Sequence, residues 1–256
     1  MPSPEATKQE IRSFWEDDPC GAARADATEG TPEFFAQVAA ARDELEPFIA
    51  DYADFASTRG RRVLEIGVGV GSDFIRFVRA GAVATGVDLT EHAIALVRRR
   101  LELEGLSADL QQADAEHLPF PDGSFDVVYS WGVLHHTPDS DRAIAEAQRV
   151  LKPGGRLCVM LYARHSWLAY ALWVRHALLK GHPTRSLGEV IAGHMESAGT
   201  RAYTPAELRK RFGGLEDLTV EHVGTPYDRQ VAGPLAAATG SRLGWFLVVR
   251  GRAPAR

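Results

Sequence analysis

Short hydrophobic segments alternate with segments of helical periodicity along most of the chain. The hydrophobic runs predict five successive strands, at residues 62–66, 83–87, 108–112, 125–130 and 156–162. Apolar residues at helical spacing predict the helices between them, at residues 72–80, 90–104 and 140–151. Such alternation is typical of a parallel sheet with helices on both faces. With two later strands, near 216–223 and 244–250, the pattern predicts a Rossmann-like, doubly wound α/β sheet of seven strands, mostly parallel with one antiparallel strand near the C-terminus.

Helix signals appear at several predicted boundaries. A threonine that can act as N-cap precedes three predicted helices, at Thr31, Thr90 and Thr204. Gly105 is a plausible stop for the helix that follows Thr90. Pro47 predicts a break in the helical segment that opens the chain's main body.

Three segments lie outside this minimal sheet. Residues 1–31 are predicted to be a mostly irregular arm, whose apolar patch at Ile11, Phe14 and Trp15 either docks as a lid or anchors a loose tail. Residues 163–203 form a predicted insertion with two helical patterns, near 166–180 and 185–197. Residues 251–256 are predicted to be a loose tail. We therefore expect an N-terminal arm followed by one domain, residues 32–256, that carries a helical insertion.

Composition narrows the class of protein. The 256 residues are 45% hydrophobic and 25% charged, which is typical of one large globular domain. The net charge of −5 gives no basic field for nucleic acid, so we expect no nucleic-acid partner. Cys20 and Cys158 are too far apart in sequence for a metal motif or a disulfide framework, so we expect no metal. Without a signal-peptide pattern or a long apolar span, a cytoplasmic location is expected.

The segment Val63–Asp73 is a hydrophobic strand that runs into a loop with glycine at every second position. Glycine lacks Cβ and tolerates positive φ, so such a loop lets the backbone approach a ligand. A dinucleotide motif would place its third glycine at Ser72, and no P-loop motif occurs in the chain. The loop therefore predicts a nucleotide-type pocket of another kind, or a plain turn between strand and helix.

A carboxylate follows the second predicted strand. Ligands of open α/β sheets lie beyond the carboxyl ends of the strands, and Asp88 stands there, 17 positions after Gly71. Asp88 can accept both ribose hydroxyls of an adenosine, whereas a lone aspartate at a strand end is more often a helix cap. Because it follows the glycine loop at this distance, we interpret Asp88 as the acceptor for the ribose hydroxyls, with Leu89 beside it in the same site.

Several separated motifs resemble one family. The E-x-G-x-G-x-G pattern of Glu65–Gly71 is similar to the signature of class I S-adenosylmethionine-dependent methyltransferases. Pro121–Asp126, Ser130–Asp139 and Leu151–Gly155 resemble the ubiquinone and menaquinone biosynthesis type of methyltransferase. The resemblance covers residues 62–162. It implies S-adenosylmethionine as cofactor and transfer of its methyl group to a small molecule.

The resemblance also implies cofactor contacts. In this family an acidic residue at the position of Asp114 accepts the adenine amine and the next backbone amide, that of Ala115, meets the ring, although Asp114 also fits a plain turn. Trp131 either packs beside the sulfonium through a cation–π contact or forms a hydrophobic wall. The expected cofactor residues are Glu65, Gly67, Gly69, Gly71, Asp88, Leu89, Asp114, Ala115, Ser130 and Trp131.

Two related chemistries are disfavoured. Methyltransferases of exocyclic or amide nitrogens carry an Asp or Asn, two prolines and an aromatic residue where this chain has Ser130–Gly132. Methylation at C5 of a pyrimidine needs a cysteine near the methyl group. Cys158 lies in a predicted buried strand and Cys20 in the arm, which is poorly placed unless the arm folds over.

Methyl transfer from a sulfonium depends mainly on alignment of acceptor, methyl and sulfur. Where the acceptor loses a proton, His135 and His136 are candidate bases because imidazole titrates near neutrality, or they are structural. Tyr162 either faces the acceptor or belongs to the core. These three are the candidate catalytic residues.

The predicted insertion is rich in apolar and aromatic residues. Insertions here commonly cover the acceptor in the resembled family, so we expect a hydrophobic or aromatic acceptor, methylated on oxygen, nitrogen or carbon. The interleaved arginines and histidines either bind an anionic group or form a solvated face. Alternatives are a lipid-like quinone or prenyl substrate with peripheral membrane contact, or a regulatory protein that binds the cofactor without turnover. The chain is expected to be a monomer or a homodimer, where the insertion packs against its own body or a partner.

Overall fold

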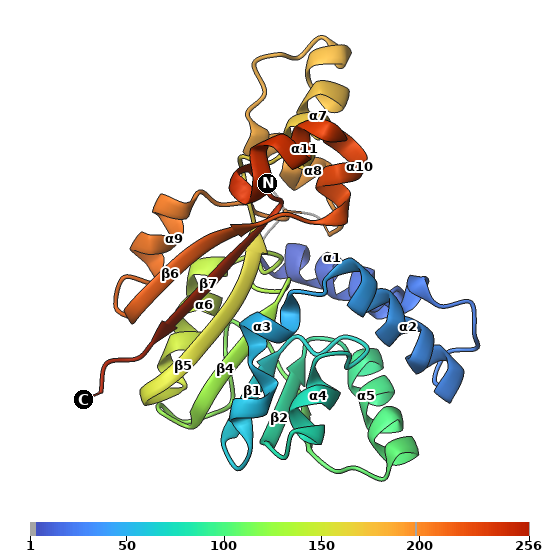
Figure 1. The fold of residues 1–256 in the computed structure, drawn as a ribbon, viewed down its shortest axis with the longest axis vertical. Coiled ribbons are helices and arrows are strands. Elements are labelled where there is room, and N and C mark those ends of the chain that lie inside the picture. Colours follow the sequence, from blue (N-terminus) through green and yellow to red (C-terminus); the bar gives the residue numbers. More distant parts are fainter. Residues whose placement is uncertain (1–3, 198, 256) are drawn as a thin grey trace.

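The computed structural model describes residues 4–197 and 199–255, which surround a seven-stranded sheet of order β3-β2-β1-β4-β5-β7-β6 (Figure 1). The strands are β1 (Arg62–Ile66), β2 (Val83–Asp88), β3 (Asp109–Gln112), β4 (Phe125–Trp131), β5 (Leu151–Tyr162), β6 (Glu216–Val223) and β7 (Phe246–Arg252). Strands β1 to β5 pair in parallel, whereas β7 pairs antiparallel with both β5 and β6. The predicted doubly wound sheet with one antiparallel strand is therefore confirmed.

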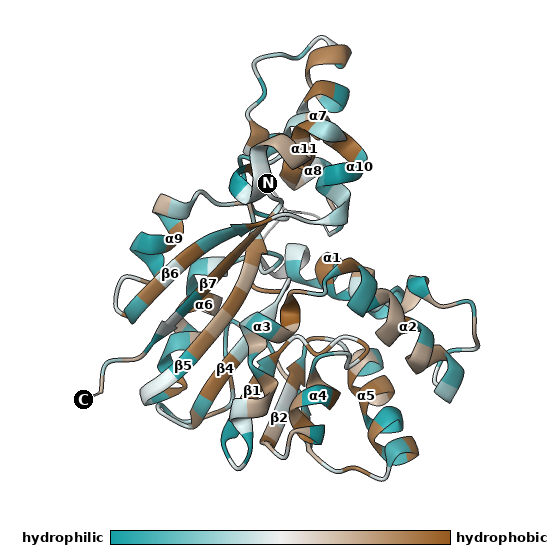
Figure 2. Cartoon of the chain, viewed as in Figure 1, coloured by the Kyte–Doolittle hydropathy of each residue, from teal (hydrophilic) through white to brown (hydrophobic). Residues whose placement is uncertain are grey.

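Helices cover both faces of the sheet. The helices of the body are α1 (Pro4–Asp17), α2 (Pro32–Leu45), α3 (Ile49–Ala53), α4 (Phe74–Arg79), α5 (Glu91–Glu104), α6 (Ser140–Arg149) and α9 (Pro205–Arg211). One core cluster joins α3, α4 and α5 to strand residues such as Val63 and Val127. A second cluster joins α6 and α9 to Leu64 and Val128. These two residues follow Val63 and Val127 in their strands, so their side chains point to the opposite face of the sheet. Figure 2 shows hydrophobic residues running through the strands between these layers.

The predicted helix boundaries follow from local chemistry. The side chains of Thr31, Thr90 and Thr204 each accept a hydrogen bond from a backbone N–H of the first helical turn. Gly105 ends α5 in the left-handed conformation, at φ +64°. Pro47 lies in the break between α2 and α3, as predicted.

The arm differs from its prediction. Residues 1–3 lie outside the described residues, but Pro4–Asp17 form the helix α1 rather than an irregular segment. Ile11, Phe14 and Trp15 follow helical spacing, and Ile11 is buried against the body. Tertiary packing of this short apolar stripe stabilises the helix. The polar composition of the arm gave no local signal for it.

Two predicted boundaries differ. The tail predicted at 251–256 begins later, because β7 continues to Arg252 and pairs with Arg156 of β5, which supplies hydrogen bonds that the local sequence does not reveal. Strand β5 begins before residue 156, at Leu151, and residues 152–155 are an irregular stretch of it in which Gly154 has φ +73°.

The two helical patterns of the predicted insertion are confirmed, and a second helical segment packs against them. They form α7 (Trp167–His176), the 3-10 turn η3 (Leu178–Lys180) and α8 (Leu187–His194). The connection between β6 and β7, where no helix was predicted, contains α10 (Pro226–Ala232), α11 (Pro234–Thr239) and the turn η4 (Gly240–Leu243). Trp167 of α7 donates to the Thr239 hydroxyl, at 2.9 Å. We call residues 163–203 and 224–243 together the helical cap, which projects from one end of the sheet (Figure 1).

Candidate functional site

A cavity of about 580 Å³ lies beyond the carboxyl ends of β1, β2, β4 and β5. Its walls also include α1, α2 and the helical cap. Cavities of this size hold ligands as large as drug-like molecules or nucleosides. Ten of the predicted site residues line it: Glu65, Gly67, Gly69, Asp88, Leu89, Asp114, Ala115, Trp131, His136 and Tyr162. The structure does not place Gly71, Ser130 or His135 among the residues that line it.

The glycine loop keeps backbone at the cavity wall. Gly67 has φ +82°, and a Cβ there would lie 2.2 Å from a methyl carbon of Val133, so only glycine fits. Gly71 serves packing instead, because a Cβ there would lie 3.0 Å from the Val97 side chain of α5. Ser130 is fully buried and its hydroxyl donates to the Ile66 carbonyl, which ties β4 to β1.

Asp88 supports the start of α5 and lines the cavity. Its Oδ1 accepts from the backbone N–H and the hydroxyl of Thr90, the N-cap residue, at 3.0 and 2.8 Å. Its Oδ2 accepts from the Gly69 N–H at 3.1 Å, which joins the carboxylate to the glycine loop. Burial raises the pKa of Asp88, while these donors oppose that rise. Asp88 is therefore not itself the helix cap, and its ribose role stays a prediction.

Asp114 meets a residue that sequence reasoning did not anticipate. Lys8 Nζ of α1 lies 2.6 Å from Asp114 Oδ2 and also bonds Glu116. Burial opposes ionisation, yet the hydrogen bond and charge of Lys8 hold the pKa of Asp114 below its ordinary value. Among the described residues, no acceptor takes the Ala115 N–H, which leaves one donor beside the Asp114 carboxylate.

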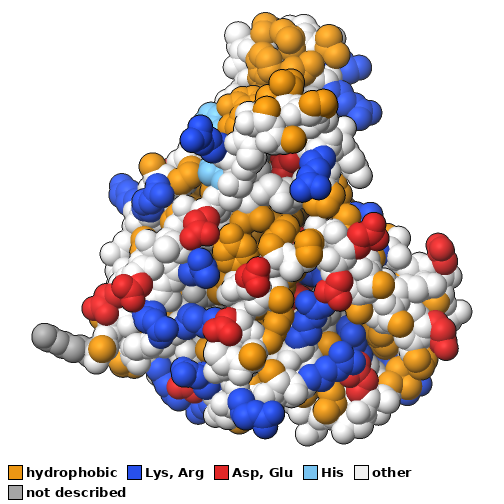
Figure 3. All heavy atoms as spheres, in the orientation of Figure 1, with side chains coloured by type: hydrophobic (Ala, Val, Ile, Leu, Met, Phe, Trp, Pro, Cys, Tyr) orange, Lys and Arg blue, Asp and Glu red, His pale blue; other side chains and the backbone are white. Residues whose placement is uncertain are grey.

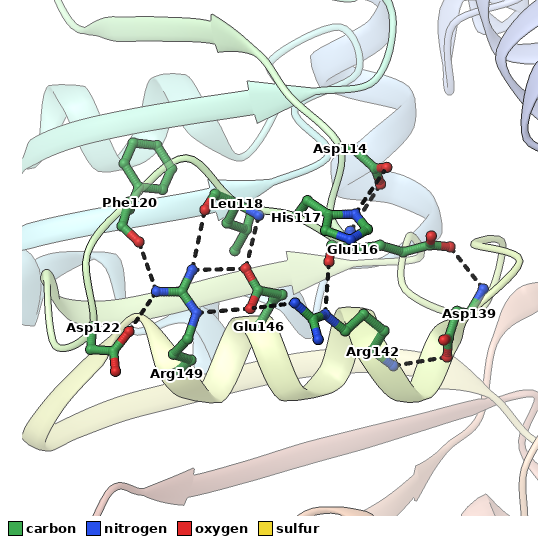
Figure 4. A network of polar contacts seen from close by, with 10 residues as sticks. All are labelled: Asp114, Glu116, His117, Leu118, Phe120, Asp122, Asp139, Arg142, Glu146 and Arg149. Carbon is green, nitrogen blue, oxygen red and sulfur yellow. Dashed lines mark hydrogen bonds and ion pairs between the residues drawn. The ribbon is translucent and has the colours of Figure 1, made fainter.

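The loop after β3 is fixed by α6 (Figure 4). Glu116 Oε1 accepts from the Asp139 N–H at 2.7 Å. Arg149 donates to the carbonyls of Leu118 and Phe120 and pairs with Glu146 at 2.7 Å. This network holds the backbone on both sides of the turn, so Asp114 and Ala115 are presented from a rigid segment.

Asp114, Glu116 and His117 are the group of possible metal ligands found among the described residues. Their ligand atoms all lie within 4.8 Å of one another. Lys8 bonds both carboxylates, so the chain itself already supplies a cation at this place.

Helix α2 contributes a charged floor to the cavity. Arg42 pairs with Asp73 at 2.6 Å and with Glu46 at 3.1 Å. Glu46 in turn accepts from the Trp131 indole N–H at 2.6 Å, which fixes the plane of that ring. Arg42 and Glu46 carry no motif, and their i,i+4 spacing resembles an ordinary surface ion pair, so sequence reasoning missed them.

This floor contains more carboxyl groups than cations. One guanidinium, that of Arg42, faces the carboxyl groups of Glu46, Asp73 and Glu65. Glu65 is 4% exposed, and its Oε2 has no hydrogen-bond partner among the described residues. Burial and the neighbouring Asp73 raise the pKa of Glu65 well above its usual range. A buried, unpartnered acceptor in an acidic floor fits a ligand that brings its own positive charge.

A second polar group lies on the side of the cavity toward the helical cap. The Tyr162 hydroxyl donates to Glu196 Oε2 at 2.9 Å, and His136 Nε2 lies 3.2 Å from the same oxygen. His136 Nδ1 contacts the hydroxyls of Ser197 and Thr200, at 2.9 and 3.0 Å. The protein therefore occupies Nδ1 of His136, whereas Nε2 faces the Glu196 carboxylate without a hydrogen-bond partner among the described residues. Sequence reasoning named Tyr162 and His136 but missed Glu196, which no motif marks.

Glu196 is the exposed member of this group, because its side chain is 40% accessible whereas that of His136 is 4% accessible. Burial opposes its charge, yet the contacts with His136 and Tyr162 hold the pKa of Glu196 below its ordinary value. His135 is fully buried, with its ring 4.0 Å from that of Tyr162. Burial and His136 hold the pKa of His135 well below its usual range, so its imidazole is neutral.

Cys20 also reaches the cavity, because the arm folds over it. Surrounding protein and the carboxylate of Glu196 raise the pKa of the Cys20 thiol to about 12. Only a minute fraction is thiolate near neutral pH, which disfavours Cys20 as a nucleophile.

This sheet, with a glycine loop and carboxylates at its strand ends, defines an α/β protein that binds a nucleoside-containing cofactor. Residues 64–159 match the family model of the methyltransferase domain. This part of the chain is a methyltransferase domain of the class I S-adenosylmethionine-dependent type, whose cofactor is S-adenosylmethionine. The resemblance seen in the sequence is thus confirmed.

Curated relatives agree with this family. The chain is 41% identical to the 27-O-demethylrifamycin SV methyltransferase of Amycolatopsis mediterranei, over 64% of this chain and 66% of that protein. It is 33% identical to a ubiquinone/menaquinone biosynthesis C-methyltransferase of Bartonella bacilliformis, over 54% of each chain. The chain spans only part of the length of the curated relatives that it matches, from 28% in one of them to 66% in the rifamycin methyltransferase.

Solved structures share the fold. The cyclase SpnF has a TM-score of 0.61 at 22% identity, covering 99% of this chain and 97% of that chain. The phosphoethanolamine N-methyltransferase 2 of Haemonchus contortus, in complex with S-adenosyl-L-methionine, has a TM-score of 0.59 at 18% identity, covering 81% and 51%. At these identities the likeness establishes the architecture alone.

Proposed function

We propose that the protein transfers a methyl group from S-adenosylmethionine to a hydroxyl group of a small, largely apolar acceptor. The observation that carries the proposal is one cavity lined by two polar groups. The first is the glycine loop with Asp88 and Asp114, and the second is the pair of Glu196 and Tyr162, joined by a hydrogen bond of 2.9 Å. The acidic floor of α2 and β1 lies in the same cavity.

The residues present fit this cofactor. Asp88 accepts the ribose hydroxyls, while Asp114 and the free N–H of Ala115 meet the adenine edge. The unpartnered Glu65 Oε2 accepts from the methionine ammonium, and Arg42 faces the methionine carboxylate. S-adenosylmethionine supplies an electrophilic methyl group on a positively charged sulfur. The Trp131 ring, held by Glu46, forms the wall beside that charge.

We propose Glu196 as the group that takes the acceptor proton. His136 is buried, with Nδ1 bonded to Ser197 and Thr200 and Nε2 turned toward Glu196, whereas Glu196 is the exposed member and no donor among the described residues bonds its Oε1. S-adenosylmethionine would supply the methyl group and leave as S-adenosylhomocysteine, and Glu196 would take the proton that the acceptor hydroxyl loses. His136 and Tyr162 position this carboxylate and share its charge. Alignment of the acceptor oxygen with the methyl group contributes most of the acceleration.

The walls suggest the nature of the acceptor. Leu168, Met195 and Phe246 line the cavity near Glu196, so one hydroxyl-binding carboxylate stands in apolar surroundings. The relatives are named for methylation of a rifamycin oxygen and of quinone carbon. A hydroxyl or phenol on a hydrophobic body is consistent with the first, and a lipid-like quinone is the second candidate.

We also propose that the arm, residues 1–31, acts as a lid and that the helical cap shapes the acceptor side within the domain of residues 32–256. Ile11, Phe14 and Trp15 of α1 line the cavity. The Trp15 ring packs edge-on to His136, with centroids 5.2 Å apart. A lid of this kind excludes water from the reacting atoms.

Calorimetry tests the cofactor assignment directly. S-adenosylhomocysteine should bind the purified protein and raise its Tm, whereas NAD should do neither. A screen of phenols, hydroquinones and macrocyclic alcohols, read by S-adenosylhomocysteine release and a mass gain of one methyl group, then tests the reaction. Absence of S-adenosylhomocysteine binding would remove the proposed function.

The acceptor role is tested separately by Glu196→Gln. With any acceptor found in the screen, we expect kcat to fall roughly 10²-fold while the Kd of S-adenosylhomocysteine is unchanged. Glu189→Gln, an exposed carboxylate on α8, is the matched control. Unchanged kcat in Glu196→Gln would assign the proton to another group.

A further inference from the structure

The helical cap carries most of the exposed large hydrophobic side chains of the described residues. Nine such side chains are exposed, and the cap contributes six: Tyr170, Val174, Leu178, Leu179, Val231 and Leu235. Leu179 is 74% exposed and Leu178 is 46% exposed, in the turn that follows α7. Figure 3 shows hydrophobic atoms gathered over the end of the molecule that Figure 1 identifies as the cap. A contiguous apolar surface of this kind marks an interaction site.

The same surface is positively charged. The cap contains seven Lys and Arg residues and three Asp and Glu residues, a net charge of +4. The whole chain carries −5, so the rest of the protein carries −9. Residues 163–188 contain no Asp or Glu at all. Arg175, Lys180 and Arg185 are exposed on either side of Leu178 and Leu179, and no described carboxylate pairs with them.

We propose that the helical cap docks on the surface of an anionic lipid bilayer. Leu178 and Leu179 would enter the headgroup region, while the flanking cations meet lipid phosphates. A second copy of the chain would bring an equal positive surface against this one, so like charges oppose self-association there. The body is acidic and is repelled by the same bilayer, which orients the cap toward the membrane.

Docking would also place the cavity wall near the bilayer. Leu168 and Met195 belong to the cap and line the cavity from within. No helix among residues 4–197 and 199–255 has the length and hydropathy needed to cross a membrane. The surface therefore serves attachment to one leaflet, and this inference does not depend on the methyl-transfer proposal.

Sedimentation with vesicles tests the proposal on the full chain. Vesicles of phosphatidylcholine with one third phosphatidylglycerol should carry the protein down, whereas pure phosphatidylcholine vesicles should carry at least tenfold less. Raising the salt should weaken the binding, because exposed charges are screened. Binding at equal strength to both vesicles, or to neither, would overturn the proposal.

Two double variants of the cap test whether the cap itself, rather than non-specific adsorption of the protein, accounts for binding to the vesicles. Leu178→Ser with Leu179→Ser, and Arg175→Glu with Lys180→Glu, should each lower the partition coefficient at least tenfold. The matched controls are Val83→Ser with Leu103→Ser, and Arg98→Glu with Arg99→Glu, at exposed positions of the body. Equal losses in the control variants would overturn the proposal. So would a dimer in solution that the leucine variant dissociates, since the surface would then be a self-interface. Unchanged S-adenosylhomocysteine affinity and Tm show that each variant is folded.

Discussion

Single carboxylates in this cavity differ in how much of their hydrogen-bonding capacity the protein itself uses. Asp88 accepts three hydrogen bonds from the chain, Asp114 is shared between Lys8 and a backbone N–H, and Glu65 keeps one buried oxygen without a partner. A residue that is already satisfied is held in place before the ligand arrives, whereas an unsatisfied one gains a partner on binding. The two kinds of carboxylate therefore respond differently to substitution.

Asp88→Ala should weaken cofactor binding while the fold is retained. The substitution removes the ribose acceptor and also frees the Gly69 N–H, so the glycine loop loses an anchor. Hydrogen bonds to a charged group contribute about 1.5–3 kcal/mol each, so we expect the Kd of S-adenosylhomocysteine to rise at least roughly tenfold. Calorimetry measures this, with Asp109→Ala, an exposed carboxylate on β3, as control. An unchanged Kd would remove Asp88 from the ribose role.

Glu65→Gln should stabilise the unliganded protein at neutral pH. The raised pKa means that the folded chain holds the Glu65 proton more tightly than the unfolded chain, whose value is about 4.5. Stability is therefore lost as the pH rises from about 4.5 through the folded-state pKa, because the unfolded chain releases this proton to water while the folded chain must keep it or bury an unpartnered charge. Replacement by neutral Gln should recover about 1 kcal/mol, roughly 2–4 °C in Tm.

The pH series distinguishes this effect from a general one. The Tm difference between Glu65→Gln and the parent should vanish near pH 4.5 and grow toward pH 8. The same variant should bind S-adenosylhomocysteine more weakly, because it no longer offers a carboxylate to the ammonium. Glu102→Gln, an exposed carboxyl on α5, should show neither change. A lower Tm at pH 8 for Glu65→Gln would contradict the assignment.

Residues marked by spacing along the chain could be predicted, and residues brought in by packing could not. Asp88 stands at a strand end in sequence as in space, so a rule for open sheets finds it. Lys8, Arg42 and Glu196 reach the cavity from the arm, from α2 and from the helical cap, and nothing in their local sequence indicates a ligand. Glu196 depends on the fold of a segment that lies beyond the family motifs.

At the scale of elements, α1 lies over the Asp114 side of the cavity. Lys8 Nζ takes the Asp114 oxygen that we propose for the adenine amine, so on this proposal the helix and the cofactor compete for one acceptor. The ion pair is about a quarter exposed on each side, and pairs of that kind contribute at most about 1 kcal/mol. Helix α1 is therefore held weakly enough at this point to yield to a ligand.

Lys8→Ala should tighten binding of S-adenosylhomocysteine by roughly two- to fivefold, since Asp114 Oδ2 becomes free and no ion pair must be broken. Calorimetry gives the change in Kd. Arg12→Ala, on the same helix, is the control and should leave the Kd unchanged. Weaker binding in Lys8→Ala would mean that Lys8 supports the cofactor rather than competing with it.

The strands and the threonine-capped helices were predictable because hydrophobic periodicity and caps are local signals. The helices α1, α10 and α11 were missed for two reasons. Proline and glycine break the α10–α11 segment into short pieces, and the apolar stripe of α1 is only one turn long. Such helices form because the rest of the molecule covers them, which periodicity within a window cannot reveal.

At the scale of the whole molecule, the cavity exists only when the arm, the sheet and the helical cap are together. Cys20 belongs to the arm and lies close to both the sheet and the helical cap. Its carbonyl and Cβ lie beside Gly69 of the glycine loop, at 3.4 and 3.7 Å from the place of a Cβ there. The Cys20 side chain is exposed, yet the protein packed around it and the carboxylate of Glu196, from the cap, raise the pKa of its thiol to about 12. The other cysteine, Cys158, is buried in β5 with a pKa raised to about 12 as well.

Alkylation of the folded protein should therefore modify Cys20 alone, and slowly. Below a pKa of about 12 the thiolate fraction rises tenfold per pH unit, so the rate should rise about a hundredfold between pH 7 and pH 9. S-adenosylhomocysteine should slow the reaction at every pH, because it fills the cavity against which the arm closes, and Cys20→Ser should abolish it. Intact-mass spectrometry after treatment with iodoacetamide measures the pH dependence, the effect of the ligand and the effect of the substitution. Fast labelling at pH 7, or a rate that the ligand does not change, would mean that the arm stands away from the cavity in solution.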